Sequence, residues 1–344
     1  MKKVLIIGTG GIGQRHIRGF LKTGRVVLSV VEPDKDKLAN VLKTYEIARG
    51  YNDLNETDIC LFDAAVICTP AHVHVPIALR CAEKGIPFLV EKPLAVTIDG
   101  AEELIKIVRS KKIEARVAYV RRVSPEVREL YRRIKAGEIG EVKNCWINIS
   151  QDFPKYRPDY QRTYYAKKAT GGGTILDCAS HMIDLLLWIM GDISEVVSIY
   201  DRLVLHGVEA EDTAAMILRF RNGAIGQINI NQFQKPNESL IEFAGTKGNL
   251  LLDGLKLKFA ADDSGKWDEK EFTAGMSLMQ AHEARFCSQA NMFLDAIEGK
   301  ECCLATLEEG YKNLIVAIAA KRSYEIKQII SVDKVKAEHE DKTA

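Results

Sequence analysis

The sequence predicts an α/β protein of two domains: a doubly wound domain on a parallel sheet, then an α/β domain with a mostly antiparallel sheet. The chain has 344 residues, which is more than one ordinary hydrophobic core accommodates. Over the N-terminal third, short apolar segments alternate with helical patterns, as they do in βαβ units. Beyond that, extended segments follow one another across short turns. We therefore expect domains at residues 1–123 and 124–344.

The first domain has the alternation that a doubly wound fold requires. Each apolar run of strand length is followed by a segment with helical periodicity, and parallel strands joined by helices bring their carboxyl ends to one edge of the sheet. The expected strands are residues 3–7, 26–31, 64–68, 87–90 and 114–120, and the expected helices are 12–21, 34–42, 75–83 and 99–110.

The second domain changes to segments of alternating hydrophobicity. Turn sequences such as Arg221-Asn222-Gly223 join them, which favours antiparallel pairing of neighbouring strands. The expected strands are residues 143–152, 195–205, 213–220, 224–232, 240–244 and 250–259, and the expected helices are 125–136, 279–298 and 306–321.

Composition narrows the class of protein. The formal net charge is +1 and there is no long basic block, so nothing indicates a nucleic-acid partner. The eight cysteines form no C-x-x-C pair and no metal-binding spacing, which is typical of reduced thiols in the cytosol. Asp177, His181 and Asp184 interrupt the most apolar stretch, so it does not predict a membrane span. We expect a cytoplasmic protein without a bound metal.

A glycine-rich loop follows the first expected strand. Gly8, Gly10 and Gly13 form G-x-G-x-x-G where a helix begins. The first glycine permits the tight turn, the second lets a pyrophosphate approach the backbone, and the third lets helix and strand pack closely. The first helical residues, Gly11 and Ile12, present free N–H groups to a phosphate. The pattern predicts a Rossmann domain that binds a dinucleotide.

Glu32 indicates which dinucleotide this is. It ends the second expected strand, 24 positions after Gly8, where a carboxylate accepts hydrogen bonds from ribose hydroxyls. A carboxylate also repels a 2′-phosphate, so NAD is favoured over NADP, although Lys35 and Lys37 follow closely and a lysine binds phosphate. Two alternatives remain at this stage. Glu32 can be a solvated glutamate at a strand end, and a glycine loop with an acidic residue can also belong to an S-adenosylmethionine methyltransferase.

Three further segments carry a family resemblance. They are Thr69-Pro70, Glu91-Lys92-Pro93 and Gly171-Gly172-Gly173-Thr174-Ile175-Leu176-Asp177-Cys178-Ala179-Ser180-His181. With the glycine loop, they resemble the Gfo/Idh/MocA family, which includes glucose–fructose oxidoreductase and inositol dehydrogenase. The resemblance implies a Rossmann domain followed by an α/β domain on a large open sheet. It also implies NAD(P)-linked oxidation or reduction of a sugar, cyclitol or related polyol, by a homodimer or homotetramer.

The same resemblance implies roles for individual residues. It makes Lys92, Asp177 and His181 the catalytic residues, each also in contact with substrate. The turn Thr69-Pro70 would lie along the nicotinamide half of the cofactor, with Glu91 and Lys92 beside it.

Two details of the chain bear on the resemblance. The family implies a cis peptide bond between Lys92 and Pro93. The segment Ala118–Arg122 has Val120 where the family often carries an asparagine, so one substrate contact is missing or supplied elsewhere. Tyr119 of this segment is a candidate substrate contact.

The helix motif also makes chemical sense residue by residue. Asp177 and His181 are four positions apart, so they share one face of a helix. Removal of a hydride from a secondary alcohol requires a base for the proton, and histidine suits neutral pH. Asp177 would hydrogen-bond substrate or stabilise an imidazolium, and Lys92 would hold the substrate oxygen in the cleft between the domains. A local polar pair and a surface lysine are the alternatives.

A segment dense in arginine and tyrosine, residues 156–168, precedes the glycine run. Arg157, Tyr160, Arg162 and Tyr165 are expected to hold a polyol, phosphate or carboxylate by stacking and bidentate hydrogen bonds. A surface loop at a subunit contact is the alternative. We therefore expect hydride transfer with a secondary alcohol or ketone of a sugar, cyclitol or nucleotide-sugar. The alternative function is an NAD-binding regulatory protein of the same fold without turnover.

Overall fold

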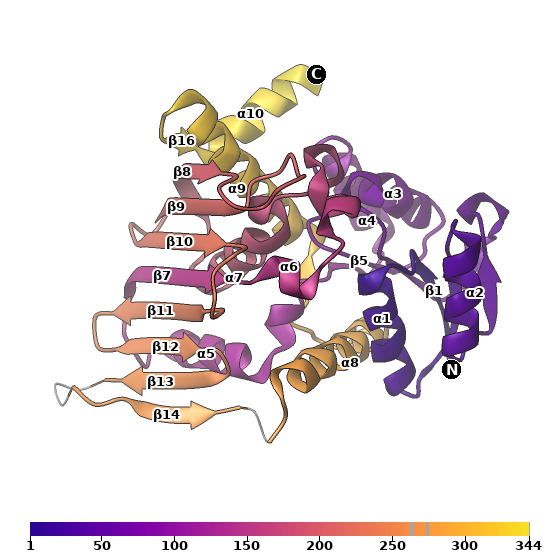
Figure 1. Cartoon of the computed structure of the whole chain (residues 1–344), viewed down its shortest axis with the longest axis horizontal. Helices are drawn as coiled ribbons and strands as arrows, with labels where there is room; N and C mark the ends of the chain where they lie inside the picture. The colour runs from indigo at the N-terminus through magenta and orange to yellow at the C-terminus, as the bar shows by residue number, and fades with distance from the viewer. Residues whose placement is uncertain (262–264, 273–274, 344) are drawn as a thin grey trace. The chain divides into compact units, whose positions relative to one another are not determined.

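The computed structural model describes residues 1–261, 265–272 and 275–343. The chain forms two compact units, whose elements are labelled in Figure 1. The first unit contains Met1–Val123 and Gly275–Tyr311, and the second contains Ser124–Ala274 and Lys312–Ala344. The sequence placed residues 275–311 in the second domain, whereas in the structure they join the first unit. Each unit has the type of sheet that the sequence predicts, so the expected fold class is confirmed.

The first unit is built on a seven-stranded sheet with the order β15-β6-β5-β4-β1-β2-β3. Strands β1 to β6 pair in parallel, and the short β15 pairs antiparallel with β6. Because β1 lies between β4 and β2, the loops after β1 and β4 lie at the switch point where doubly wound sheets bind ligands. The strands are β1 (Lys2–Ile7), β2 (Val26–Val31), β3 (Arg49–Tyr51), β4 (Ala64–Ile67), β5 (Phe88–Val90), β6 (Ala115–Val117) and β15 (Ala305–Thr306).

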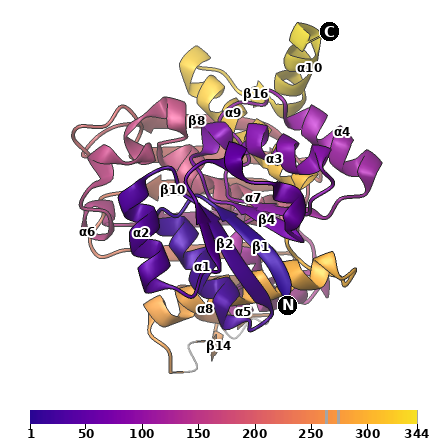
Figure 2. The same ribbon diagram turned by 90° about the vertical axis from the view of Figure 1, so that its right-hand side faces the viewer.

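Helices join the parallel strands of this sheet, and they can be followed in Figure 2. They are α1 (Gly11–Lys22), α2 (Lys35–Thr44), α3 (His74–Glu83) and α4 (Ala101–Lys111), with α8 (Leu278–Ile297) added from the later segment. Short 3₁₀ turns occur at Leu54–Glu56, Ile59–Leu61, Ala71–Val73 and Val120–Val123.

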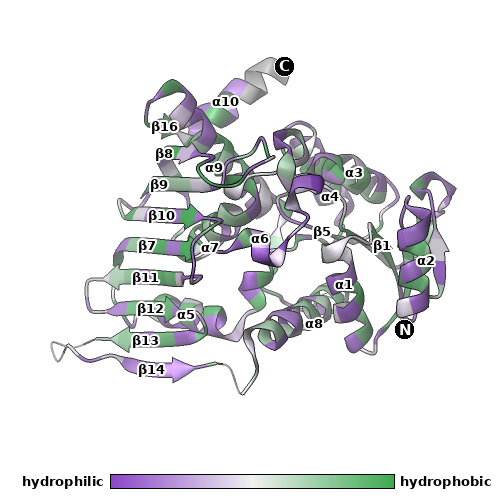
Figure 3. Ribbon diagram, in the orientation of Figure 1, coloured by the Kyte–Doolittle hydropathy of each residue, from purple (hydrophilic) through white to green (hydrophobic). Residues whose placement is uncertain are grey.

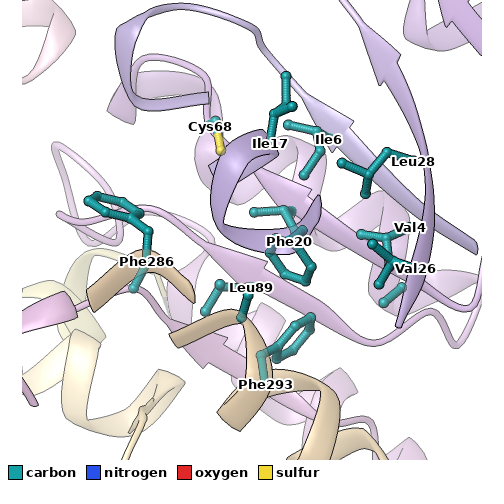
Figure 4. Packing of buried hydrophobic residues seen from close by; sticks show 14 of the residues in the cluster. Val4, Ile6, Ile17, Phe20, Val26, Leu28, Cys68, Leu89, Phe286 and Phe293 are labelled. Atoms are coloured by element: carbon teal, nitrogen blue, oxygen red, sulfur yellow. The ribbon is translucent and has the colours of Figure 1, made fainter. Parts of the chain in front are cut away.

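Helix α8 belongs to the first unit because its aromatic side chains complete the core beside α1. Phe286 and Phe293 are nearly fully buried there, and the ring of Phe293 meets that of Phe20 edge-on at a centroid distance of 6.4 Å (Figure 4). Gly19 of α1 permits this contact, since a Cβ at that position would lie 2.8 Å from the backbone of Phe286. Nothing local in the sequence of α8 indicates this partner.

The second unit contains a nine-stranded sheet with the order β14-β13-β12-β11-β7-β10-β9-β8-β16 (Figure 1). Only β7 and β10 pair in parallel among the described strands of this sheet. The single strand expected at 250–259 is two strands, because Gly254 makes a turn between them with φ of 60°. The strands are β7 (Val142–Ser150), β8 (Ile193–Asp201), β9 (Thr213–Phe220), β10 (Ile225–Asn231), β11 (Ser239–Gly245), β12 (Asn249–Asp253), β13 (Lys256–Ala260), β14 (Asp268–Glu271) and β16 (Ile330–Ser331).

Buried and exposed residues alternate along the central strands of this sheet, and the hydropathy colouring of Figure 3 follows that alternation. The helices of the unit are α5 (Pro125–Lys135), α6 (Phe153–Tyr156), α7 (Ser180–Met190), α9 (Leu307–Ile326), which begins in the first unit, and α10 (Val332–Thr343). A π-helical turn at Ile175–Ala179 precedes α7, and 3₁₀ turns lie at Tyr160–Arg162, Tyr164–Ala166 and Lys168–Thr170. Segment Lys168–Met190 is apolar and long enough to cross a membrane, but 67% of its apolar window is buried, which is typical of a core helix.

Candidate active site

The glycine loop after β1 is shaped by close backbone contacts. Gly8 has φ of +93°, and a Cβ there would lie 2.9 Å from the carbonyl oxygen of Cys68. A Cβ on Gly13 would lie only 2.1 Å from the carbonyl oxygen of Gly8. At Gly10 and Gly11, by contrast, an added Cβ meets no atom of the described residues within 4 Å. Two glycines therefore close the turn, and two leave open space beside the start of α1.

Glu32 is tied to this loop. It ends β2 at 8% exposure, and its Oε2 accepts from the backbone N–H of Thr9 at 2.9 Å and from the Thr9 hydroxyl at 2.8 Å. Its Oε1 accepts from the N–H of Asp34 at 3.2 Å. A carboxylate offers about four acceptor positions, so Glu32 retains capacity for a ribose hydroxyl. Lys37 pairs with Asp34 at 3.3 Å.

Two more loops leave the same edge of the sheet. Thr69-Pro70 follows β4, and Glu91-Lys92-Pro93 follows its neighbour β5. The Lys92–Pro93 bond is cis, which confirms that expectation. Lys92 itself is half-buried. The buried hydroxyl oxygen of Thr69 has no hydrogen-bond partner among the described residues.

These features of the first unit fit a dinucleotide. The open space at Gly10 and Gly11 suits a pyrophosphate at the N-terminus of α1, where no side chain caps the helix. The spare acceptor capacity of Glu32 suits a ribose, and the unpartnered hydroxyl of Thr69 suits a polar group of the nicotinamide half.

Two buried histidines beside these loops are absent from the site expected from sequence. His16 of α1 bonds through Nε2 to Oε1 of Glu91 at 2.7 Å. His74, the first residue of α3, lies within hydrogen-bond distance of two backbone carbonyl oxygens, those of Thr69 and Pro93. The signal for His16 was its place on the apolar face of α1, where an uncompensated polar group is costly.

In the second unit, the glycine run determines how the helix with Asp177 begins. Gly173 has φ of +104°, and a Cβ there would lie 2.5 Å from the carboxylate of Glu211. Glu211 is 2% exposed, and its Oε1 accepts from the N–H of Ile175 at 3.1 Å. Lys321 lies 3.7 Å from the same oxygen. The buried Glu211 carboxylate thus caps the start of the helix. The helix dipole stabilises a negative charge at this end.

This helix does not begin as the regular α-helix that the spacing predicts. The N–H of Ser180 donates to the carbonyl of Ile175, and this bond between residues five positions apart defines the π-turn. Asp177 lies inside the turn, whereas His181 lies in the first turn of α7, and both are half-buried. Turns of this kind are frequent at functional sites. Asn313 of α9 holds the junction by donating to the Ser180 carbonyl at 2.7 Å.

The arginine- and tyrosine-rich segment divides into core and surface. Tyr160 and Tyr165 are 9% and 0% exposed, and their hydroxyls donate to the backbone carbonyls of His206 at 3.1 Å and Glu211 at 3.3 Å. Their rings pack with Phe153, so both tyrosines, which the sequence assigned to the substrate site, lie in a hydrophobic core of the described structure.

Tyr164, which the expected site omitted, contacts a candidate catalytic residue. Its hydroxyl donates to Oδ1 of Asp177 at 2.7 Å, and the side chain is 44% exposed. Tyr164 and the buried Tyr165 are neighbours in one 3₁₀ turn and point in different directions, which the composition of the segment does not reveal. Of the two arginines, Arg157 is half-buried and Arg162 is exposed. Tyr119, after β6, is 1% exposed.

Comparisons with known proteins agree with this arrangement. Residues 2–119 match the family model "Oxidoreductase family, NAD-binding Rossmann fold", and residues 127–251 match "GFO/IDH/MocA C-terminal domain". The matches confirm the expected family resemblance, the oxidoreductase class and NAD as cofactor, and they set aside the methyltransferase alternative.

Individual relatives extend over much of the chain. The scyllo-inositol 2-dehydrogenase (NAD(+)) of Bacillus subtilis is 24% identical over 93% of this chain and 93% of its own length. The levoglucosan dehydrogenase of Pseudarthrobacter phenanthrenivorans is 27% identical over 69% of this chain and 68% of its own. The crystal structure of the WlbA dehydrogenase of Bordetella pertussis, in complex with NADH and UDP-GlcNAcA, has a TM-score of 0.80 at 24% identity. It covers 96% of this chain and 98% of that one, and it shares the fold.

Proposed function

Because the chain belongs to the GFO/IDH/MocA family of NAD-binding oxidoreductases, we propose that it transfers a hydride between NAD and a secondary alcohol or ketone of a sugar, cyclitol or nucleotide-sugar. The names of the curated relatives, dehydrogenases of scyllo-inositol and of levoglucosan, support this substrate class.

One observation within the first unit carries the proposal. The glycine loop, Thr69-Pro70 and Lys92 follow β1, β4 and β5, which are neighbours in the sheet. The cradle for a dinucleotide and the ammonium of Lys92 therefore share one edge of one sheet. An ammonium beside a bound nicotinamide is suited to stabilise negative charge on an alcohol oxygen as it loses its hydrogen.

The residues of the chain divide the remaining work. NAD, when bound, supplies the hydride acceptor or donor. Lys92 holds the reacting oxygen of the substrate, and His181 takes the hydroxyl proton, since an imidazole is a competent base near neutral pH. Asp177, oriented by the hydroxyl of Tyr164, hydrogen-bonds the substrate or stabilises the imidazolium. The spare donors of Arg157 and Arg162 extend the substrate site.

The experiment begins with a panel of inositols, sugars and nucleotide-sugars, each assayed with NAD and with NADP by NADH or NADPH absorbance. On the best substrate, His181→Ala and Lys92→Ala are each expected to lower kcat by about 10²–10⁴. The NADH dissociation constant is expected to change little, because neither residue belongs to the loop that holds the pyrophosphate or ribose. His206→Ala, at an exposed histidine of the second unit, serves as the matched control.

Near-normal kcat in either variant would contradict the assignment. NADH binding without turnover of any compound in the panel would favour the regulatory alternative.

We also propose that the protein is cytoplasmic and a homo-oligomer. All eight cysteines are free thiols, which suits a reducing compartment. Ile199, Ile217 and Ile225, on the neighbouring strands β8, β9 and β10, are 67%, 53% and 37% exposed. Exposed isoleucines on three neighbouring strands favour association with a second copy. Light scattering after gel filtration tests the assembly, and a monomer at micromolar concentration would exclude it.

A further inference from the structure

A buried polar network crosses the first unit beneath the loops assigned to the cofactor. His16 and His74 are each 1% exposed and Glu91 is 5% exposed. We propose that these three side chains are positioning residues that couple occupation of the glycine loop to the placement of Lys92. The inference rests on the proposed function, in which the glycine loop holds NAD and Lys92 contacts the substrate.

The first connection runs from α1 to the loop after β5. His16 comes three residues after Gly13, on the helix whose N-terminus would meet the pyrophosphate. Its Nε2 lies 2.7 Å from Oε1 of Glu91, which is 75 residues away in the chain. The other side of the ring meets Phe286 edge-on at 5.2 Å. An apolar side chain at this position would remove the hydrogen bond to the buried Glu91 carboxylate, so the contact gives His16 a role beyond packing.

The second connection runs from Glu91 to the backbone of Lys92. While Oε1 of Glu91 bonds to His16, Oε2 accepts from the N–H of Lys92 at 3.1 Å. One carboxylate therefore holds both the helix of the glycine loop and the peptide from which the lysine side chain departs. The backbone N–H of Glu91 donates to the carbonyl of Ile67 at 2.9 Å, so Glu91 also lies beside the end of β4.

His74 ties the loops after β4 and β5 to each other. Its Nε2 lies 2.7 Å from the carbonyl oxygen of Thr69, and its Nδ1 lies 2.9 Å from that of Pro93. Burial lowers the pKa of His74, and the two carbonyls and the Glu91 carboxylate oppose that shift. The three loops of the cofactor edge are thus joined by side chains from α1 and α3, in addition to the strand ladder beneath them.

Joined in this way, the loops cannot adjust independently. A small displacement of α1 when its N-terminus receives an anion moves His16, then Glu91, and through it the peptide of Lys92. Hydrogen-bond chains between packed elements carry coupling of this kind, and changes along them typically alter it by about 2- to 30-fold. Loss of His16 should therefore separate cofactor binding from lysine placement without abolishing either.

The test compares three variants of the full-length protein. His16→Leu removes the nitrogen that donates to Glu91, and His16→Gln restores an amide nitrogen near the position of Nε2. Phe20→Leu is the control. Phe20 lies on the same helix, is 0% exposed and packs against Phe293. Hydrogen exchange of the segments around residues 8–13 and 88–96 is followed with and without saturating NADH, together with NADH affinity by fluorescence and kcat on the best substrate.

We expect NADH to protect both segments in the unsubstituted protein. In His16→Leu, protection should persist at 8–13 and be largely lost at 88–96, with kcat lowered about tenfold and NADH affinity changed less than about threefold. His16→Gln should recover most of the protection and rate, and Phe20→Leu should behave like the unsubstituted protein in both segments, whatever its thermal stability.

Equal protection at 88–96 in His16→Leu and the unsubstituted protein would overturn the inference. So would a loss in Phe20→Leu as large as that in His16→Leu, or failure of His16→Gln to recover when its fold is intact by circular dichroism. If the unsubstituted protein does not bind NADH, the proposed function fails, and the coupling fails with it. Binding and protection without turnover would instead refute only the proposed catalysis.

Discussion

The glycine loop must pack closely against α1, and it must leave space for the cofactor. Replacement of Gly13 and of Gly10 by alanine should separate these two requirements. A Cβ on Gly13 would lie 2.1 Å from the carbonyl oxygen of Gly8, whereas ordinary contact begins near 3.4 Å. Helix α1 must therefore withdraw from the loop by about 1 Å, and overpacking of this kind typically costs about 1–3 kcal/mol. For a domain of this size, each kcal/mol lowers Tm by about 2–4 °C, so we expect Gly13→Ala to melt about 5 °C lower.

Gly10→Ala should behave in the opposite way. Within the part of the chain that the structure describes, no atom lies within 4 Å of a Cβ at this position, and the backbone angles, φ of −60° and ψ of −172°, suit alanine. Stability should be unchanged within about 0.5 kcal/mol. The added methyl would occupy the space assigned to the pyrophosphate, so the NADH dissociation constant should rise about tenfold or more, which corresponds to about 1.4 kcal/mol.

Differential scanning fluorimetry measures the first effect and titration of NADH fluorescence the second. Gly13→Ala should lose both stability and affinity, because its displaced loop no longer presents the helix N-terminus correctly. Gly10→Ala with unchanged NADH affinity would refute the assignment of the open space to the cofactor. Gly13→Ala with an unchanged Tm would refute the packing argument.

Three further outcomes follow from particular side chains. Glu32→Gln should narrow the preference for NADH over NADPH by about tenfold, because it removes the charge that repels a 2′-phosphate; an unchanged ratio of the two dissociation constants would exclude that role. Burial, with Arg15, Arg285 and Arg121 nearby, lowers the pKa of His282 from 6.5 to about 4. The unfolded chain therefore binds this proton first, and stability should fall by about 1–2 kcal/mol as pH drops from 6.5 to 4, after allowance for partial exposure. Urea unfolding should show that loss in the unsubstituted protein and a flatter profile in His282→Gln, and parallel profiles would contradict it. Phe293→Ala, at 0% exposure in the core between α1 and α8, should cost about 3–5 kcal/mol in urea unfolding, and a cost below about 1 kcal/mol would show that α8 is dispensable to the first unit.

The parts of the protein that the sequence predicts are those whose physical requirements are local in the chain. Alternation of apolar strands with helical periodicity specifies the parallel sheet, because side chains must alternate in burial with the period of each element. The glycine loop is equally local: the left-handed backbone of Gly8 and the missing Cβ of Gly13 are demands of one short turn. Glu32, the cis bond before Pro93 and the helix motif ending at His181 are likewise recognised within short segments.

Tertiary structure alone decided which distant residues serve these segments. His16 and Glu91 are 75 positions apart, and Glu211 caps a helix that begins 36 positions earlier. No periodicity in the sequence links such pairs, since each side chain is an ordinary polar residue within its own segment. Tyr164 and Tyr165 are adjacent in one 3₁₀ turn, Tyr164–Ala166, yet the hydroxyl of Tyr164 reaches Asp177 and that of Tyr165 donates to the Glu211 carbonyl, because neighbouring residues of such a turn point in different directions. Helix α8 lies in the first unit for the same reason: no periodicity in its sequence reveals that it packs beside α1, where Gly19 leaves room for the backbone of Phe286.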